Sequence, residues 1–263
     1  MAGDLDLGRA REVAVDAARA AGEILRSRVD SIREIRHKSA VDIVTDVDLQ
    51  SEHEVSARLL EAFPTHAILG EEGGARAGSD ARYRWIVDPL DGTTNYAHGF
   101  PFFCVSIGLE VDGRMALGVA YAPSLDELFV AETGRGATVN DRPMRVSTTA
   151  ELPLALLATG FPYDRAEFPR ALRSFELLSL RSQAVRRAGS AVLDLCYVAC
   201  GRLDGYWEHH VSPWDVAAGS LMVQEAGGAV TRTDGSGFSV DSGQVLASNG
   251  VLHASLATLL AGL

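Results

Sequence analysis

Two aspartates stand three positions apart at the end of a hydrophobic run, in a turn that can gather oxygen ligands. The segment 85–95 passes from the hydrophobic run through Asp88 and Asp91 to Gly92. The proline between the aspartates stiffens the bend, and the glycine permits a backbone angle that other residues avoid. Such a turn can direct Asp88, the Leu90 carbonyl and Asp91 toward one point. Several hard oxygen ligands with positions left for water are typical of a magnesium site.

The same turn offers hydrogen-bond donors as well as acceptors. The backbone N–H groups of Gly92 and Thr93 would open a helical turn, and N–H groups in that position bind anions. An Asx-type turn, in which each aspartate accepts a hydrogen bond from nearby backbone, is the simpler explanation of an isolated motif of this kind. The metal hypothesis therefore depends on other acidic segments of the chain.

Three further acidic segments are candidates to join this turn. Glu71 follows the strand-like run 67–69 and precedes glycines, which suits either a metal ligand or a solvated acidic loop. Asp215 falls in the first turn of a helix beginning at Pro213, where a carboxylate also serves as a cap. The third segment is 38–48. Two like charges about 4 Å apart repel by about 4 kcal/mol at an effective dielectric constant of ~20. If the segments converge, cations must be present.

Other common catalytic motifs are absent from the sequence. It contains no phosphate-binding P-loop, no dinucleotide-binding glycine fingerprint and no serine nucleophile elbow. The cysteines Cys104, Cys196 and Cys200 are sparse, which favours a reducing cytoplasm, and the last two are expected to pack in the core. His209 and His210 are adjacent in a predicted strand and point to opposite faces. We expect them to have surface or packing roles.

Composition narrows the classes of partner. The chain has 35 acidic against 24 basic residues and a net charge of −11, which argues against nucleic acid as a partner. No segment approaches the ~20 apolar residues of a membrane span. The N-terminus has no signal-peptide pattern. We therefore expect a cytoplasmic protein that associates with neither membranes nor nucleic acids.

The elements that must position these residues follow from hydrophobic periodicity. We expect helices at 5–29, 46–62, 168–180, 190–199, 213–225 and 251–260, and strands at 67–69, 84–87, 104–111, 115–121, 127–131, 154–158, 203–208, 229–233 and 245–247. Asp112 and Gly113 predict a hairpin turn. Mixed strands and helices of this kind form layers of sheets and helices. We expect one domain, 1–263, with subdomains of about 1–150 and 151–263.

Taken together, the motifs resemble the inositol monophosphatase family, within the wider group of lithium-sensitive, magnesium-dependent sugar and nucleotide phosphatases. The resemblance covers nearly the whole chain and rests on segments 70–72, 85–101 and 214–228 in this order. It implies an α/β fold, the αβαβα sandwich shared by inositol monophosphatases and fructose-bisphosphatases. It also implies a homodimer and a small phosphorylated polyol or sugar as substrate.

The resemblance further implies a set of site residues that bind two or three Mg²⁺ ions. The first ion is assigned to Glu71, Asp88 and the Leu90 carbonyl, the second to Asp88, Asp91 and Asp215, and a weaker third to the neighbourhood of Glu71. The catalytic residues are Asp48, Thr93 and Glu71, of which the first two orient and deprotonate the attacking water. The substrate contacts are assigned to Gly92, Thr93, Gly189, Ser190, Ala191, Glu208 and Asp215.

The implied reaction is hydrolysis of inositol 1-phosphate by water, without a covalent intermediate. Segment 94–96 and Glu208 favour this branch of the family over fructose 1,6-bisphosphate, histidinol phosphate, nucleotide 3′-phosphates or NADP. A regulatory binding protein on the same fold is the alternative from another class. Lithium inhibition is expected, with a strength that depends on two segments one residue shorter than in animal members: that between Lys38 and Asp48 and the loop after Glu71.

Overall fold

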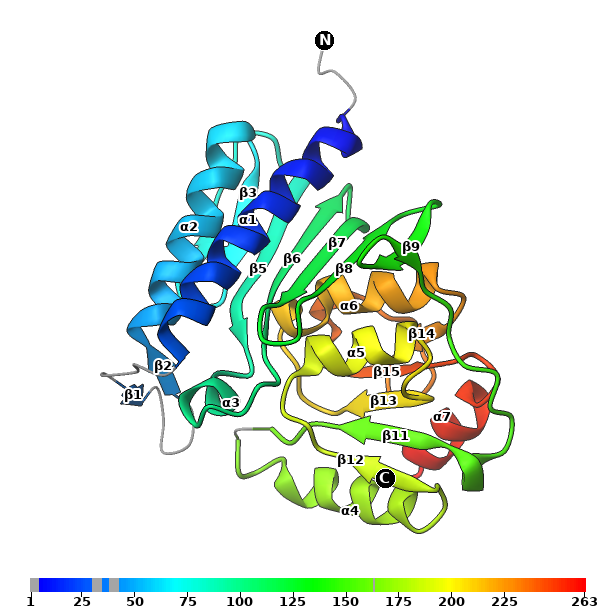
Figure 1. The fold of residues 1–263 in the computed structure, drawn as a ribbon. Helices are drawn as coiled ribbons and strands as arrows, with labels where there is room; N and C mark the ends of the chain where they lie inside the picture. The colour runs from blue at the N-terminus through cyan, green and yellow to red at the C-terminus, as the bar shows by residue number, and fades with distance from the viewer. Residues whose placement is uncertain (1–4, 30–34, 38–42, 163) are drawn as a thin grey trace.

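The protein is described from a computed structural model of the 263-residue chain. It describes residues 5–29, 35–37, 43–162 and 164–263, with the side chains of 35–37 and 43–45 excepted. Two mixed sheets alternate with three layers of helices, as Figure 1 shows. The predicted αβαβα sandwich is confirmed. The division of the chain near residue 150 remains a prediction.

Helices α1 (Leu7–Arg28) and α2 (Asp46–Ala62) form the first layer, beside one face of the larger sheet. The Asp6 carboxylate caps α1 by accepting the Arg9 N–H at 3.1 Å. The buried face of α1 consists mainly of alanine, so the helix lies close to the sheet. A Cβ atom on Gly22 would stand 2.4 Å from the Tyr121 ring. Both helices were predicted within two residues.

The larger sheet has eight strands in the order β10-β9-β8-β7-β6-β5-β3-β4. Its strands are β3 (Ala67–Gly70), β4 (Gly74–Arg76), β5 (Tyr83–Asp91), β6 (Cys104–Val111), β7 (Arg114–Ala122), β8 (Glu127–Glu132), β9 (Gly136–Val139) and β10 (Arg142–Pro143). All neighbours are antiparallel except β3 and β5. Asp112 and Gly113 form the predicted turn between β6 and β7, and both have positive φ.

Helices α5 (Ala191–Ala199) and α6 (Pro213–Glu225) lie between the two sheets and are buried on nearly all sides. Small residues early in α6 allow its neighbours to approach closely. A Cβ on Gly118 of β7 would stand 2.8 Å from the Ala218 carbonyl oxygen. A Cβ on Gly219 would stand 2.6 Å from Leu195 of α5. These glycines allow one helix to contact a sheet and a second helix at backbone distance.

The smaller sheet has five strands in the order β12-β11-β13-β15-β14. Its strands are β11 (Leu156–Thr159), β12 (Ala184–Arg186), β13 (Gly205–Glu208), β14 (Ala229–Thr231) and β15 (Val245–Ser248). Helices α4 (Phe168–Ser179) and α7 (His253–Ala261) cover its outer face. Strands β11, β12 and β13 are parallel, so their carboxyl ends lie at the same edge. The remaining short elements are β1 (Ile35–His37), β2 (Ile43–Thr45), α3 (Thr93–Ala97), η2 (Leu152–Leu154) and η3 (Val240–Ser242).

Most boundaries in this half differ from the prediction by one or two residues. The strand expected at 154–158 begins at Leu156, because the proline-containing η2 occupies the preceding turn. His209 and His210 were also placed in a strand, but β13 ends at Glu208, where the predicted range 203–208 ends. The two histidines follow in a bend, the first buried and the second exposed. The expected packing and surface roles therefore fit them, but their placement in a strand was wrong.

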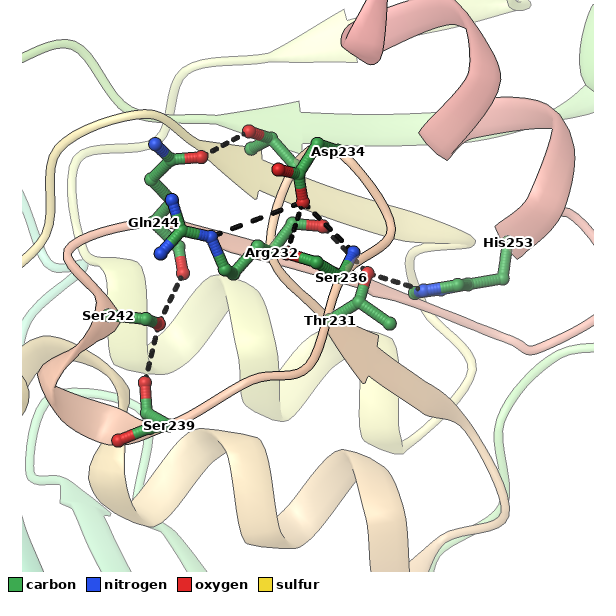
Figure 2. Close-up of polar contacts among 9 residues, drawn as sticks. Thr231, Arg232, Asp234, Ser236, Ser239, Ser242, Gln244 and His253 are labelled. Atoms are coloured by element: carbon green, nitrogen blue, oxygen red, sulfur yellow. Dashed lines mark hydrogen bonds and ion pairs between the residues drawn. The ribbon is translucent and has the colours of Figure 1, made fainter.

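The connection between β14 and β15, residues 231–244, is held by polar side chains that bond to one another (Figure 2). Thr231 Oγ1 lies 2.9 Å from His253 Nε2, and Thr233 donates to Gln244 at 2.6 Å. Ser236 donates to the Asp234 carboxylate through both its N–H and its hydroxyl. These bonds give this long connection a defined shape without a hydrophobic core of its own. Among the described residues, none of the helices is long and apolar enough to cross a membrane.

Candidate active site

The turn with two aspartates is an irregularity at the carboxyl end of β5. Asp88 pairs with Ser106 of β6, and Asp91 pairs with Cys104. Between these two pairs β5 advances by three residues and β6 by two, so β5 contains one extra residue. Such a bulge redirects side chains at a strand end. The Leu90 N–H donates to Asp88 at 3.0 Å, which is the bond expected of an Asx turn. The simpler explanation of this motif thus holds for Asp88, but not for Asp91, whose hydrogen-bond donors include Ser190, Ala191 and Val192.

Gly92 ends the turn with φ of +94°, as its left-handed position requires. A Cβ there would lie 3.0 Å from the Phe102 carbonyl oxygen, so both the backbone angle and the available space favour glycine. Thr93 then begins the short helix α3. The side chain of Asn95 bonds to the Phe102 and Ala188 carbonyls at 2.7 and 2.9 Å. Asn95 therefore fixes the loop rather than facing a ligand.

Asp91 joins the larger sheet to the start of α5. Its carboxylate accepts hydrogen bonds from the Ser190 hydroxyl at 2.5 Å, the Val192 N–H at 2.8 Å and the Ala191 N–H at 3.3 Å. A helix N-terminus favours a carboxylate in this position. The Ser190 hydroxyl, which the resemblance assigned to substrate, donates its proton to Asp91 in this structure.

Glu71 follows β3, and because β3 and β5 are parallel neighbours it lies beside Asp88. The loop after it is built around Glu52 of α2, which sequence reasoning missed. The Glu52 carboxylate accepts the N–H groups of Glu72 at 2.8 Å and Gly73 at 2.6 Å. A Cβ on Gly70 would stand 2.6 Å from the same carboxylate. A buried glutamate thus shapes the loop, although Gly73 and Gly74 are exposed, as in the solvated acidic loop that was the alternative.

Asp215 is the third residue of α6 and caps the helix, because its Oδ2 accepts the Ser212 N–H at 2.7 Å. Capping was the alternative explanation for this residue, and it is confirmed. A carboxylate has acceptor sites on two oxygens, so a cap made by one oxygen does not exclude a ligand at the other.

All the predicted metal ligands and substrate contacts line one cavity. It lies where the carboxyl ends of β5, β11, β12 and β13 face the N-termini of α5 and α6 (Figure 1). Six carboxylates line it: Glu71, Asp88, Asp91, Asp194, Glu208 and Asp215. Within the described part of the chain, Arg187 is the one basic residue of this lining. The carboxyl edge of parallel strands is a common place for ligands in α/β proteins.

The carboxylates around the β5 turn are held at high electrostatic cost. Burial raises the pKa of Asp88 well above its usual value, and repulsion from Glu71, Asp91 and Asp215 raises it further. Burial also raises the pKa of Asp91 to about 6, despite the three hydrogen bonds. Asp215 shows the same direction, from burial first and then from Asp91. A cation at this position would relieve the repulsion.

The donor set fits magnesium in its chemistry. It consists of carboxylates and the Leu90 carbonyl, with neither cysteine nor histidine, and hard oxygen ligands of this kind suit Mg²⁺. Among the described residues, no three acidic, histidine or cysteine side chains are arranged so that they could hold a metal ion by themselves. Mg²⁺ commonly retains several waters and shares its remaining positions with substrate oxygens. The cavity therefore suits an open site and not a closed protein cage.

Asp48 and Thr93 are brought together from α2 and α3. The Thr93 hydroxyl lies 3.3 Å from Asp48 Oδ1 and 3.0 Å from the Leu90 carbonyl oxygen, and its single proton can be donated to either. Asp48 is fully buried. The Ser51 hydroxyl on the same helix donates to the Pro89 carbonyl at 2.7 Å and fixes α2 against the turn. Lys38 lies outside the described residues.

Glu208 lies on the opposite wall, at the end of β13. It is buried, and it accepts a hydrogen bond from the Tyr206 hydroxyl. A Cβ on Gly160, which follows the parallel strand β11, would overlap the Glu208 carboxylate. Burial raises the pKa of Glu208 to about 7. The alternative of a surface glutamate is therefore wrong.

Sequence reasoning missed Asp194, Arg187 and Phe161 on this wall. The Arg187 guanidinium lies over the Phe161 ring at 5.9 Å. Cys104, Cys196 and Cys200 are free thiols. Of the two that were expected in the core, Cys196 is buried and Cys200 is partly buried against the core. Tyr96 is buried and donates to the Leu25 carbonyl at 2.8 Å, so it supports α1 and not a ligand.

Comparison with known proteins places the chain among close relatives. A model of the inositol monophosphatase family matches residues 6–262. The chain is 46% identical to an inositol-1-monophosphatase of Synechocystis over 258 residues, 97% of this chain and 90% of that protein. It is 44% identical to the Nus factor SuhB of Pseudomonas aeruginosa over 255 residues, 94% of each chain. An inositol monophosphatase structure from Anabaena matches with a TM-score of 0.90 at 46% identity, over 98% of both chains.

Proposed function

Because the chain belongs to the inositol monophosphatase family, we propose that it is a magnesium-dependent phosphatase that hydrolyses inositol 1-phosphate or a similar small phosphate monoester. The observation that carries the proposal is the convergence of Glu71, Asp88, Asp91 and Asp215 on one cavity. Nothing but a bound cation or protonation relieves the repulsion among them. We assign two or three Mg²⁺ ions to these carboxylates and the Leu90 carbonyl.

Bound magnesium would act as a Lewis acid, lowering the pKa of water and stabilising charge on the phosphoryl group. The chain itself supplies the route for the proton. A water within reach of the Thr93 hydroxyl gives up its proton as it attacks phosphorus. Asp48 accepts that proton through the Thr93 hydroxyl, which already lies 3.3 Å from it. The bond between phosphorus and the alcohol oxygen breaks in the same displacement, and the leaving oxygen takes a proton from solvent water, so no covalent enzyme intermediate is needed.

We assign the phosphoryl group and the polyol of the substrate to different ends of the cavity. Gly92 and Thr93 line the cavity beside the acidic cluster at the β5 turn, and we assign the phosphoryl group to this end. Glu208, Gly189 and Ala191 face the polyol end, where carboxylate and backbone groups suit hydroxyls. This arrangement supports a polyol or sugar phosphate over a flat nucleotide. The cytoplasm is the proposed location and a homodimer the proposed assembly.

Phosphate release in Mg²⁺ tests the proposal. The panel contains inositol 1-phosphate, fructose 1,6-bisphosphate, histidinol phosphate, adenosine 3′-phosphate, NADP and p-nitrophenyl phosphate. We expect inositol 1-phosphate to give the highest kcat/KM, loss of activity in EDTA and inhibition by lithium. Full activity in excess EDTA would refute the metal mechanism. Preference for another substrate would move the protein to a sibling branch.

A binding function is the second candidate, because a relative 44% identical over nearly the whole chain is named Nus factor SuhB. A protein with that role need not hydrolyse anything. The same assay separates the candidates, since a folded wild-type protein that releases no phosphate from any substrate would favour binding. The predicted absence of a nucleic-acid partner is tested in parallel by titration with single-stranded RNA.

A further inference from the structure

Asp194 is a buried carboxylate on the polyol side of the cavity, and no part of the proposed chemistry uses it. It lies in the first turns of α5, is 2% exposed and lines the cavity. Its backbone N–H donates to the Ser190 carbonyl at 3.0 Å as part of the helix. Among the described residues, no hydrogen bond or ion pair reaches its side chain. Its surroundings therefore differ from those of every other buried acidic residue that the structure describes.

The helix itself does not require this side chain. Ser190 is the N-cap of α5, and its hydroxyl accepts the Leu193 N–H at 3.3 Å. Asp91 accepts the N–H groups of Ala191 and Val192. The first N–H groups of α5 thus have acceptors before Asp194 is reached. A role for Asp194 in capping is excluded by these contacts.

A buried carboxylate without a partner is costly, so its partner must come from the cavity that it lines. The charged groups that act on it are Asp91, Glu208 and Arg187. The Arg187 guanidinium lies over the Phe161 ring and not in an ion pair with Asp194. One wall of the cavity thus presents two carboxylate acceptors, one guanidinium donor and one aromatic face. Hydroxyl groups and the apolar face of a ring complement such a wall.

We propose that Asp194 is a specificity-determining residue that accepts a hydrogen bond from a substrate hydroxyl other than the one held by Glu208. Two carboxylates on different elements, α5 and β13, then read two hydroxyls of one ring. The cavity selects polyol and sugar phosphates that carry both hydroxyls over monoesters that carry one or none. The inference deepens the proposed function and rests on it.

Substitution at Asp194 tests this by comparing two substrates. Asp194→Ala should lower kcat/KM for inositol 1-phosphate about tenfold to a hundredfold, the usual loss of a hydrogen bond to a charged group. The same variant should change kcat/KM for p-nitrophenyl phosphate less than about twofold, since that substrate has no hydroxyls. Asp194→Asn keeps the shape and one acceptor, and it should show a smaller loss in the same direction. It also provides a folded variant if alanine leaves too large a cavity.

Asp204 provides the matched control, because it is a buried carboxylate with protein partners. It accepts the Leu156 N–H at 2.7 Å and the Ser147 hydroxyl at 2.5 Å. Asp204→Asn should lower the Tm and leave the ratio of kcat/KM between the two substrates unchanged. Equal losses on both substrates in Asp194→Ala would overturn the inference, because they would assign Asp194 to the metal side or the fold. No loss on either would overturn it as well.

Deoxy analogues of inositol 1-phosphate identify the hydroxyl. For Asp194→Ala, one analogue should have the same kcat/KM as inositol 1-phosphate, because it lacks the hydroxyl that Asp194 would bind. For Glu208→Ala, a different analogue should show this equality. If the same analogue serves both variants, Asp194 acts only through Glu208. If the wild type releases no phosphate from either substrate, the proposed function fails. Titration calorimetry with inositol 1-phosphate and Mg²⁺ then tests Asp194 alone. Tenfold weaker binding by Asp194→Ala is expected, and equal binding would overturn the inference.

Discussion

The acidic cluster at the β5 turn and the β14–β15 connection both gather aspartates and hydroxyls, with opposite results. In the connection, Asp234 accepts two hydrogen bonds from Ser236 in an exposed position, and these bonds lower its pKa (Figure 2). At the turn, burial and repulsion raise the pKa of Asp88 even though it accepts the Leu90 N–H. The same residue type is thus stabilised as an anion in one region and destabilised as an anion in the other.

This difference separates polar groups that complete a structure from those that await a ligand. The hydroxyls and carboxylates of the connection form hydrogen bonds with one another. These bonds fix the conformation of the chain and require no ligand. The carboxylates of the cavity accept some hydrogen bonds from helix N-termini and turns, yet they still repel one another. A polar cluster with unrelieved charge is the better candidate for function.

Removing a central carboxylate should have the largest effect. Asp91→Asn should lower kcat/KM by about a thousandfold or more. The reason is that several kcal/mol of transition-state stabilisation would depend on the metal ions that these ligands hold. Mg²⁺ should also raise the Tm of the wild type more than that of the variant, since a ligand that binds only the folded state stabilises it. An unchanged rate would remove Asp91 from the site.

Asp48 and Thr93, the proposed water-activating pair, should have the next largest effect. Asp48→Asn and Thr93→Ala should lower kcat by about a hundredfold with little change in KM, because they act on the proton of the attacking water. Steady-state kinetics on inositol 1-phosphate measure both constants. A change confined to KM would assign the pair to substrate binding.

Glu208 tests the polyol end of the cavity. Glu208→Ala should lower kcat/KM for inositol 1-phosphate by about tenfold to a hundredfold, since a hydrogen bond from hydroxyl to carboxylate contributes ~1.5–3 kcal/mol. Hydrolysis of p-nitrophenyl phosphate should barely change. Equal losses on both would show that Glu208 supports the metal side or the fold.

The pH dependence of the metal-free protein tests the repulsion directly. Asp91 has a folded-state pKa of about 6 against a reference of 3.8, so its contribution to stability is present below the reference and lost as pH rises through the folded value. In EDTA, the Tm of Asp91→Asn minus that of the wild type should therefore increase between about pH 4 and about pH 6. With Mg²⁺ this increase should shrink. A constant difference would mean that Asp91 bears no electrostatic penalty.

The smallest effect is expected in the β14–β15 connection. Asp234→Asn keeps an acceptor for Ser236 in an exposed position, so activity should be unchanged and the Tm should shift by less than about 2 °C. Thermal melts with and without Mg²⁺ measure this. A Tm response to Mg²⁺ altered as strongly as in Asp91→Asn would break the distinction between the two regions.

Much of the fold could be predicted from the sequence, because local signals and burial agree there. Helix α6 begins at Pro213 as predicted, where proline at the first helical position coincides with a cap. The β6–β7 hairpin was predicted from two turn residues with positive φ. The strand predicted at 84–87 continues to Asp91, since the bulge keeps pairing with β6 beyond the proline.

The site could be predicted only where function leaves a local pattern. Asp88, Glu71 and Asp215 stand beside prolines, glycines or a helix start, and they line the cavity as expected. Glu52 and Asp194 lie inside helices without such marks, and only long-range packing shows that one shapes a loop and the other faces the cavity. His209 was misplaced because the pairing of β13 with β15, which the local sequence does not reveal, ends at Glu208.

The grip of Asp91 on the start of α5 has a thermodynamic consequence. One carboxylate both faces the acidic cluster and holds the Ser190 hydroxyl and the Val192 N–H of the helix that carries Asp194. An ion that binds to Asp91 would therefore also affect α5, the helix whose Asp194 is proposed to contact the polyol. Linkage makes this influence reciprocal: whatever factor magnesium contributes to polyol affinity, the polyol must return to magnesium affinity. A preferred substrate would then raise the affinity of the site for magnesium, and a poor substrate would leave the magnesium occupancy low.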